Sequence, residues 1–309
     1  MNERIVFMGT PDFAANILEG LIKAEYNIVA VVTQPDAEIG RKRILTPSSV
    51  KSVALKYNIP VLTPNKIRLE YEPVLAYKPD LIITSAYGQI IPSEILDYPK
   101  YKCINTHGSL LPKYRGASPI QTAIINGETT TGMSIMYMNE KMDEGDILVQ
   151  KTIDIDIHDT STTLFNKMSN LTLDILLDFL PKLFNNDINP IKQDDSKATY
   201  THLLKKDIEH IDFNDNVLNV YNHIRGLLDN PGCHFMIKGK QYKIIDAFYE
   251  LADNCKANTF IGLFDNYLRI DCKDGFIKIY DLKPEGKNTM NAKAFFNGNG
   301  RNLVGETIE

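Results

Sequence analysis

Short apolar runs alternate with helix-like stretches through the first half of the chain, and this alternation restricts the fold more than any other feature. Runs that are apolar at nearly every position, rather than at every second one, are typical of strands buried on both faces. Helices between such strands cover the two faces of a parallel sheet. The pattern therefore predicts an α/β fold with an open, doubly wound, mostly parallel sheet. The expected strands are Arg4–Met8, Ile28–Thr33, Leu81–Ser85 and Lys102–Thr106, and the expected helices include Phe13–Ile22 and Pro47–Tyr57.

Two further elements are expected to complete this first domain. Met133–Met138 and Ile147–Ile157 alternate in polarity around the turn Asn139–Gly145, which predicts an antiparallel hairpin. A helix is expected at about Leu164–Leu180. It should end before Pro181, because proline has no N–H to donate and its ring clashes with the preceding turn.

The second half of the chain has a different pattern. Residues 187–206 are polar and break the alternation, so we expect a linker there, between a catalytic domain at 1–186 and a second domain at 207–309. A length of 309 residues agrees with two domains. After a helix at about Asn214–Leu228, five runs spaced roughly 8–12 residues apart predict a small β-barrel. These runs are His234–Ile237, Gln241–Tyr249, Thr259–Phe264, Leu268–Cys272 and Phe276–Asp281.

The charge of the chain argues against a protein that binds nucleic acid over its whole surface. The formal net charge is −5, and the residues after 196 carry equal numbers of basic and acidic side chains. Two local basic clusters remain, one at Arg41–Arg43 and one formed by Lys238, Lys240 and Lys243. Each is either a solvated loop or a local contact for nucleic acid.

Other features exclude several classes of protein. No stretch reaches the ~18 uncharged apolar residues of a membrane span, and the N-terminal residues carry charges of both signs without a signal-peptide pattern. The four cysteines lie far apart with no C-x-x-C pair, so neither a disulfide framework nor a zinc site is predicted. This cysteine pattern fits a reducing cytoplasm. Because no heptad repeat or long exposed apolar run is present, we expect a monomer.

Asn105 and His107 are the strongest candidates for catalysis from their position. They lie two residues apart where an expected strand ends, so both side chains leave the same face of that strand. Ligands of open α/β sheets bind outside the carboxyl ends of the strands. The alternative is a polar pair that is hydrogen-bonded to nearby backbone, and position alone does not separate the two.

These residue types suit direct acyl transfer between two bound substrates. An asparagine amide can donate to an oxygen that becomes negative, and an imidazole can move the proton of an attacking amine. A carboxylate from Asp143 or Asp146 can orient the imidazole, although acids beside glycine also serve turns alone. Ser109 lacks the G-x-S-x-G setting of a nucleophile, no G-x-G-x-x-G loop follows the first strand, and no metal-ligand spacing surrounds His107.

Eight sequence blocks, found in order, make the chain resemble the methionyl-tRNA formyltransferase family, a branch of the folate-dependent formyltransferases. The Asn-x-His and Asp-x-Gly motifs mark the wider group. SLLPKYRGASPI is similar to the tRNA and sugar branches, and GRKRILTPSSVK with the KPEGK block favours the tRNA branch. The blocks are FMGTPDFA, VTQPD, GRKRILTPSSVK, AYGQIIP, NTHGSLLPKYRGASPIQ, TGMSIMYM, MDEGDIL and KPEGKNTMNAKAFFNG.

The resemblance implies a Rossmann-like catalytic domain followed by an OB-like β-barrel that binds tRNA. It implies transfer of a formyl group from the co-substrate 10-formyltetrahydrofolate to the α-amine of methionine on initiator tRNA, for translation initiation, without a metal. Residues of this sequence that match the family's catalytic residues are Asn105, His107 and Asp143, and Asp146 matches a second acid with a less direct role.

The resemblance also assigns binding residues. The segment that matches the folate site contains Ser109, Leu110, Leu111 and Pro112, and it is bordered by Ala86, Tyr87, Gly88 and Gln89. The basic insertion that enters the tRNA acceptor arm in the family is matched by Arg41, Lys42 and Arg43.

Two other functions stay open. One is formylation of an amino sugar carried on a nucleotide, which the KPEGK block and the basic residues at 41–43 argue against. The other is a tRNA- or folate-binding protein without catalysis, which the complete set of Asn105, His107 and Asp143 argues against. The second domain departs from the family pattern, with Phe213 where Trp is frequent, so its tRNA contacts are the part that the resemblance constrains least.

Overall fold

The computed structural model describes residues 2–40 and 42–309, which form two compact units. One unit contains the chain up to Gly116 together with Thr131–Ile153 and Phe165–Tyr200. The other contains Ala117–Thr130, Asp154–Leu164 and Thr201–Glu309. The chain therefore passes between the units several times along its length. The domains predicted at 1–186 and 207–309, with a linker at 187–206, stay predictions.

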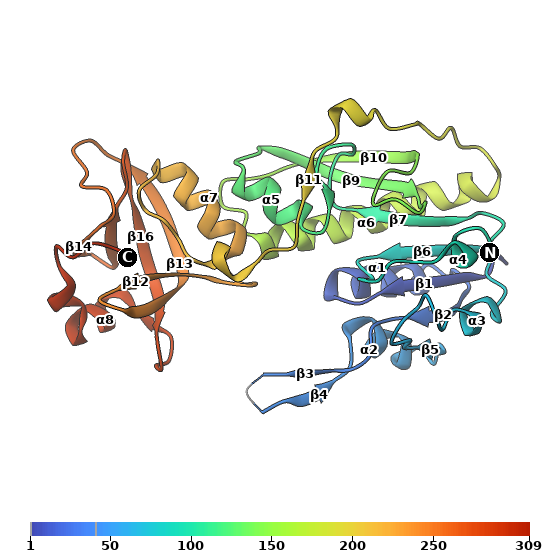
Figure 1. The fold of residues 1–309 in the computed structure, drawn as a ribbon, viewed down its shortest axis with the longest axis horizontal. Coiled ribbons are helices and arrows are strands. Elements are labelled where there is room, and N and C mark those ends of the chain that lie inside the picture. The colour runs from blue at the N-terminus through green and yellow to red at the C-terminus, as the bar shows by residue number, and fades with distance from the viewer. Residues whose placement is uncertain (1, 41) are drawn as a thin grey trace. The chain divides into compact units, whose positions relative to one another are not determined.

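A seven-stranded sheet organises the first unit, in the order β10–β9–β7–β6–β1–β2–β5 (Figure 1). The pairs β1–β2, β1–β6, β6–β7 and β2–β5 are parallel, whereas β9 runs antiparallel to β7. Every residue of β1 and β6 is buried, as expected for central strands covered on both faces. The predicted α/β fold class with a mostly parallel sheet is confirmed. The strands are β1 (Ile5–Gly9), β2 (Ile28–Val32), β5 (Val61–Leu62), β6 (Leu81–Ser85), β7 (Cys103–His107), β9 (Thr130–Tyr137) and β10 (Ile147–Asp154).

Several helices pack against this sheet and against each other. α1 (Asp12–Lys23) lies beside α6 (Ser161–Phe184), where the rings of Phe13 and Phe165 meet edge to face with centroids 6.1 Å apart. Val6 and Met8 of β1 pack in a cluster that includes residues of α3 (Glu72–Leu75) and α4 (Ser93–Leu96). Ser48 precedes α2 (Ser49–Lys56), and its hydroxyl caps the helix by accepting a hydrogen bond from the Lys51 N–H at 3.0 Å.

The prediction that the long helix ends before Pro181 is wrong, because α6 continues to Phe184. Proline removes one backbone donor, and here that loss falls within the last turn of the helix. Phe179, Leu180 and Leu183 continue a buried apolar face across this position. Burial of that face offsets the local cost of the proline.

A small hairpin replaces the loop expected around the basic cluster. β3 (Ala37–Ile39) and β4 (Ile44–Thr46) pair antiparallel and extend away from the large sheet (Figure 1). Ile44 and Leu45 are 61% and 66% exposed, so these apolar residues do not belong to the core. A hairpin without a buried face has no periodic pattern in the sequence, which explains why it was not predicted.

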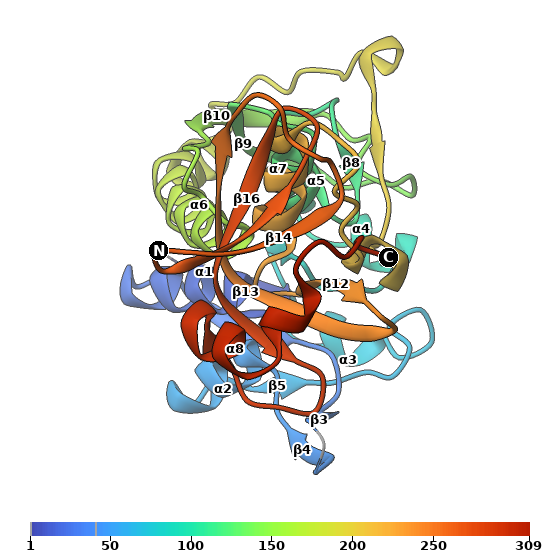
Figure 2. The ribbon, with the colours of Figure 1, turned by 90° about the vertical axis from the view of Figure 1, so that its left-hand side faces the viewer.

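A six-stranded antiparallel sheet, ordered β12–β13–β16–β15–β14 with β17 paired to β16, forms the second unit (Figure 2). All five predicted runs are strands of this sheet. Its core contains Phe213, Phe235 and Phe260, which are almost completely buried, together with residues of two helices. The elements are β12 (Cys233–Ile237), β13 (Lys240–Leu251), β14 (Thr259–Phe264), β15 (Tyr267–Asp271), β16 (Gly275–Pro284), β17 (Met290–Asn291), α7 (Val217–Leu227) and α8 (Ala292–Gly298).

Short elements complete the chain. They are β8 (Arg115–Gly116), α5 (Pro119–Ile125), β11 (Tyr200–Thr201) and 3-10 turns at Asp195–Lys197, Lys206–Glu209 and Gly300–Leu303. Within the described residues, no helix has the length and apolar character needed to cross a membrane.

Candidate active site

The carboxyl ends of β6 and β7 bring Asn105 and His107 to one edge of the large sheet. Asn105 pairs in register with Thr84 of β6, and His107 is the last residue of β7. The direction in which strands are added reverses between β1 and β6, and α/β proteins bind ligands at such a point. His107 is only 5% exposed.

Asp143 joins these residues from the turn between β9 and β10. Its Oδ2 lies 3.5 Å from His107 Nδ1 and accepts a hydrogen bond of 2.9 Å from the Gly116 N–H. Its Oδ1 lies 3.4 Å from the amide nitrogen of Asn105. The Asn105 amide oxygen accepts a bond of 2.9 Å from the Thr84 hydroxyl, so the amide nitrogen is turned toward Asp143. The structure thus brings the three predicted residues together, and their catalytic role is still a prediction.

The contacts of His107 determine which ring nitrogen can exchange a proton. Nε2 lies 2.8 Å from the carbonyl oxygen of Tyr114, and a carbonyl oxygen can only accept a hydrogen bond. Nε2 therefore carries a proton. Nδ1 faces Asp143 and is the nitrogen that can gain or lose a proton in this arrangement.

The turn that carries Asp143 is tightly constrained. Asp143 has a φ of 53°, in the left-handed region that a residue with a side chain adopts only with support from its surroundings. A Cβ at Gly145 would overlap the backbone oxygen of Tyr137, so only glycine allows the turn to lie this close to β9. The Asp-x-Gly spacing therefore has a steric cause.

Gln193 supports this turn from outside it. Its Nε2 donates to the carbonyl oxygens of Asp143 and Gly145, at 2.8 and 2.7 Å. Its Oε1 accepts from Nε and Nη2 of Arg115, at 3.1 and 2.9 Å. Arg115 is fully buried and forms a salt bridge of 2.7 Å with Asp195. A buried arginine thus fixes a glutamine, and the glutamine fixes the backbone of Asp143.

Sequence reasoning missed Gln193 and Asp195. Both lie in the stretch predicted to be a linker, where a polar residue gives no periodic or motif signal. Arg115 lies in the SLLPKYRGASPI block, and its place in a strongly matching block was the one available sign that it has a role.

Comparisons with known proteins identify the family. A family model described as formyl transferase matches residues 3–180, and one described as formyl transferase, C-terminal domain, matches residues 203–300. The chain belongs to the formyl transferase family. A methionyl-tRNA formyltransferase of Geobacillus sp. (strain WCH70) is 47% identical over 305 residues, which cover 97% of this chain and 96% of that protein.

Two solved structures share the fold at low identity. WlaRD, a sugar 3N-formyl transferase solved in the presence of dTDP and 5-N-formyl-THF, is 23% identical, with a TM-score of 0.68 over 93% of this chain and 100% of that chain. HypX from Aquifex aeolicus, solved in complex with tetrahydrofolic acid, is 17% identical, with a TM-score of 0.70 over 98% of this chain and 48% of that chain. At these identities the likeness shows the fold alone.

The first predicted folate-binding segment of this formyl transferase follows β7 directly. Ser109 is completely buried, and its hydroxyl donates to the Lys113 carbonyl oxygen at 2.6 Å. Leu111 is 4% exposed, whereas Leu110 and Pro112 are half-buried. The side chains of Ser109 and Leu111 therefore hold the segment in place, and Leu110 and Pro112 are the more accessible ones.

The second predicted segment follows β6. Ala86 and Gly88 are exposed, and both have a positive φ. Tyr87 is 4% exposed and belongs to the core of the first unit. The amide oxygen of Gln89 accepts a hydrogen bond of 2.8 Å from the Ile67 N–H. A ligand at this loop would therefore meet Ala86, Gly88 and backbone rather than the ring of Tyr87.

Of the predicted tRNA-binding residues, Lys42 and Arg43 lie in the turn of the β3–β4 hairpin. Arg41 lies outside the described residues. Lys42 and Arg43 are exposed, and the Arg43 side chain, which is 81% exposed, lies 3.6 Å from Glu38. An ion pair as exposed as that of Arg43 with Glu38 is weak. The charges of Lys42 and Arg43 are therefore accessible to a ligand.

Asp146 does not join the cluster of Asn105, His107 and Asp143. It is exposed, and its backbone oxygen accepts from the Tyr137 N–H at 2.9 Å. Across residues 2–40 and 42–309, no group of three or more His, Cys, Asp or Glu side chains could hold a metal ion.

We expect Gln193→Leu to lower the free energy of unfolding by about 2 kcal/mol or more, because it removes the two hydrogen bonds donated to the carbonyl oxygens of Asp143 and Gly145 and the two accepted from Arg115. Turnover should fall as well, since the Asp143 turn loses its support. Urea unfolding and steady-state kinetics measure both effects. Asp195→Asn is the control: the variant's amide oxygen can still accept the hydrogen bond from Arg115 Nη2, and the side chain is 70% exposed, so the loss should be smaller than in Gln193→Leu. Equal losses in the two variants would contradict the supporting role of Gln193.

Proposed function

We propose that this protein transfers the formyl group of 10-formyltetrahydrofolate to the α-amine of the methionine on initiator tRNA, giving formylmethionyl-tRNA for translation initiation. The observation that carries the proposal is the 47% identity to a methionyl-tRNA formyltransferase over nearly the full length of both chains. The contact between Asn105, His107 and Asp143 supplies the chemistry. The enzyme acts in the cytoplasm as a monomer and uses no metal.

The reaction needs one new bond, one broken bond and one proton transfer. The amine nitrogen of methionine bonds to the formyl carbon, the bond from that carbon to N10 of the folate breaks, and a proton passes from the amine to N10. Negative charge develops on the formyl oxygen while these changes occur. The protein must therefore stabilise an oxyanion and move a proton.

Asn105 stabilises the oxyanion. Its amide oxygen is engaged by Thr84, which turns the two N–H bonds of the amide nitrogen toward the site. One of them points to Asp143 at a long 3.4 Å, and the other is available to the formyl oxygen. A donor held in place before the reaction costs no reorganisation when charge develops.

His107 moves the proton through Nδ1. The backbone carbonyl oxygen of Tyr114 keeps Nε2 of His107 protonated, so the ring gains or loses its proton only at Nδ1. Asp143 lies beside Nδ1 and stabilises the imidazolium that forms when the amine loses its proton. Gly116 and Gln193 hold Asp143 at this distance.

The residues at the two strand ends fit a pterin-bearing co-substrate by their accessibility. Leu110 and Pro112 offer apolar surface, and the loop from Ala86 to Gln89 offers backbone groups. Arg41, Lys42 and Arg43 bind phosphates of the tRNA acceptor arm.

The test is incubation of the protein with 10-formyltetrahydrofolate and one acceptor at a time. The acceptors are methionyl initiator tRNA, methionyl elongator tRNA and a nucleotide-linked amino sugar. We expect formylmethionine with initiator tRNA. Formylation of the sugar alone would overturn the proposal, and so would binding without any formyl product.

His107→Ala and Asp143→Ala should each lower kcat by well over ~100-fold, the usual scale for acid–base groups. Because the two act together, the double variant should lose far less than the product of the single losses. His223→Ala is a matched control, since His223 is a half-buried histidine whose Nε2 also lies 2.8 Å from a backbone oxygen, that of Ile208. Single-turnover kinetics measure the rates. Near-normal turnover in either site variant would remove this pair from the mechanism.

Asn105→Ala should cost about 3 to 4 kcal/mol in transition-state stabilisation, as does removal of other oxyanion donors. Asn105→Asp should cost at least as much, because it places a second carboxylate 3.4 Å from Asp143 and offers an acceptor to the oxyanion. The comparison of kcat/KM for the two variants measures this difference. An active Asp variant would mean that Asn105 does not donate to the reacting oxygen.

Replacement of Arg41, Lys42 and Arg43 together by alanine should weaken binding of initiator tRNA and lower the slope of log Kd against log salt by about two to three units. Folate binding should not change. A control that removes Lys23, Lys56 and Lys66, which are exposed residues of the same unit outside the hairpin, alters the net charge equally. Filter binding at several salt concentrations measures the slopes. Identical slopes for the two triple variants would sink the assignment of the hairpin to tRNA.

A further inference from the structure

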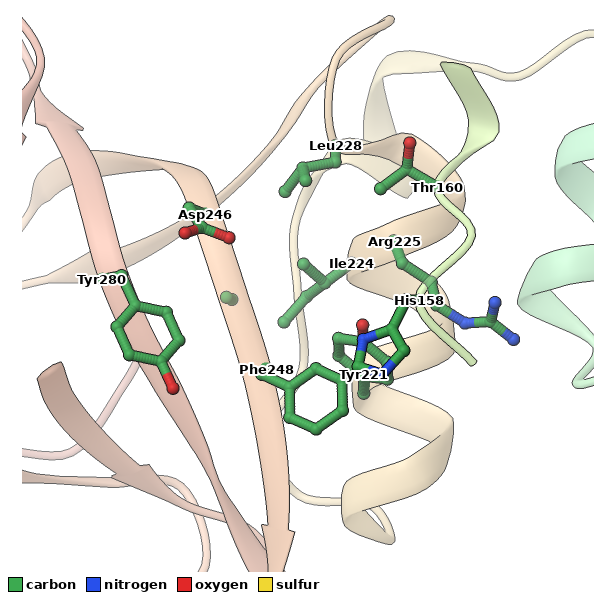
Figure 3. Close-up of a pocket in the computed structure, with 10 residues that line it drawn as sticks. His158, Thr160, Tyr221, Ile224, Arg225, Leu228, Asp246, Phe248 and Tyr280 are labelled. Atoms are coloured by element: carbon green, nitrogen blue, oxygen red, sulfur yellow. The ribbon is translucent and has the colours of Figure 1, made fainter. Parts of the chain in front are cut away.

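A cavity of about 400 Å³ lies within the second unit, and the reaction described above does not use it. Its wall combines aromatic rings with one carboxylate: Phe248 and Asp246 come from β13, Tyr280 from β16, and Tyr221 from α7 (Figure 3). His158, from the segment before α6, lies beside Phe248. The volume suits a group the size of a nucleoside rather than a helical stem of RNA.

The rings of this cavity are held in fixed positions. His158 stacks on Phe248 with centroids 4.9 Å apart and planes 11° apart, and Tyr221 meets Phe248 edge-on at 5.1 Å. Arg225, which also lines the cavity, turns its guanidinium away in Figure 3. Its Nη1 donates to the carbonyl oxygens of Asp156 and Asp159 at 3.0 and 2.9 Å. The cavity therefore offers flat aromatic surface without a free cation among the described residues that line it.

Asp246 supplies the polar contact. It stays accessible to solvent, and desolvation together with the negative charge of Asp281 raises the pKa of its carboxyl above the ordinary value. A group that donates a hydrogen bond to this carboxylate would therefore improve its environment.

We propose that this cavity binds a single nucleobase that carries an exocyclic amino group, presented as an unpaired nucleotide of the RNA partner. The base lies against Phe248 and Tyr280, and its amino group donates to Asp246. Adenine, cytosine and guanine have such a group and uracil does not. The proposal deepens the proposed function and rests on it for the identity of the RNA.

The charges around the cavity favour contact with a base over contact with phosphates. Lys278 is the register partner of Phe248, and Arg269 is the register partner of Lys278. Lys278 forms a salt bridge with Glu250, and Arg269 forms one of 2.6 Å with Asp271. Because each cation already has a carboxylate partner, the recognition is by stacking and one hydrogen bond. Such binding releases few counterions and depends little on salt.

The first experiment measures binding of AMP, CMP, GMP and UMP to the full chain by saturation-transfer NMR. We expect AMP, CMP and GMP to bind and compete with one another, with UMP at least about tenfold weaker. Asp246→Ala should remove this preference, because the carboxylate is its cause. Equal binding of all four nucleotides, or of none, would overturn the proposal. Spermidine that displaces the nucleotides and binds more tightly would assign the cavity to an organic cation instead.

The second experiment measures the Kd of initiator tRNA for Tyr280→Leu and Asp246→Ala. Loss of the stacking contact in Tyr280→Leu, or of the hydrogen bond in Asp246→Ala, should weaken tRNA binding about tenfold. The slope of log Kd against log salt should not change. Tyr280→Phe keeps the ring and should bind normally. Phe264→Leu is the surface control, because Phe264 is a 41% exposed ring on β14 that does not line the cavity. Thermal unfolding checks that each variant is folded. The two cavity variants remove different side chains, so each tests the cavity independently.

The outcomes separate this proposal from the proposed function. A wild-type protein that formylates initiator tRNA while both cavity variants bind tRNA normally overturns the cavity proposal alone. If both variants lose nucleotide binding but keep their affinity for tRNA, the cavity binds free nucleotides. That result overturns the proposal that the base belongs to the RNA partner. Formyl transfer at saturating tRNA should keep its kcat in both variants, since neither residue lies in the first unit.

Discussion

The geometry of the candidate active site depends on one buried arginine. Arg115 has no exposed surface, and burial works against its charge, yet hydrogen bonds to Asp195 and Tyr200 outweigh that effect and the pKa of Arg115 is raised. A buried cation must be fully hydrogen-bonded to be tolerated. Gln193 meets part of this need through its oxygen, and so its amide nitrogen is left in the one orientation that reaches the Asp143 turn. The charge of Arg115 therefore determines where the carboxylate of Asp143 lies.

Much of this architecture could be predicted because it follows from local patterns. β1 is apolar up to its final glycine and β6 up to its final Thr-Ser, and the strands of the second unit alternate between turns. The position of Asn105 and His107 at a strand end follows from the same pattern. Gln193 could not be predicted, because its role comes from residues 48 to 78 positions away in the chain. The prediction for the end of α6 was wrong because it considered only the tendency of Pro181 to end a helix. Burial of Leu183, which follows Pro181, keeps this part of the chain helical.

The Asp-x-Gly motif at Asp143 has two possible interpretations from the sequence. As a pattern, an acid two residues before glycine indicates either catalysis or ordinary turn chemistry. The structure gives the physical reason for both residues: Asp143 has a left-handed backbone with its carboxylate on the Gly116 N–H, and Gly145 lies against Tyr137 without room for a side chain. A strained residue held by several bonds is typical of functional sites. The motif is therefore a single unit that orients one carboxylate.

Under the proposed function, a chain with a net charge of −5 must hold a strongly negative RNA. Attraction by total charge is excluded, so the binding energy has to come from a few placed contacts. On the second unit, several cations are already paired with carboxylates, as Lys238 is with Glu306 at 2.8 Å. Lys42 and Arg43 are exposed, and among the described residues Arg43 pairs with Glu38 only at the longer distance of 3.6 Å. Electrostatic attraction is then concentrated on one hairpin of the first unit, and the second unit contributes contacts of short range that do not depend on charge. An acidic enzyme can bind RNA in this way without a basic surface.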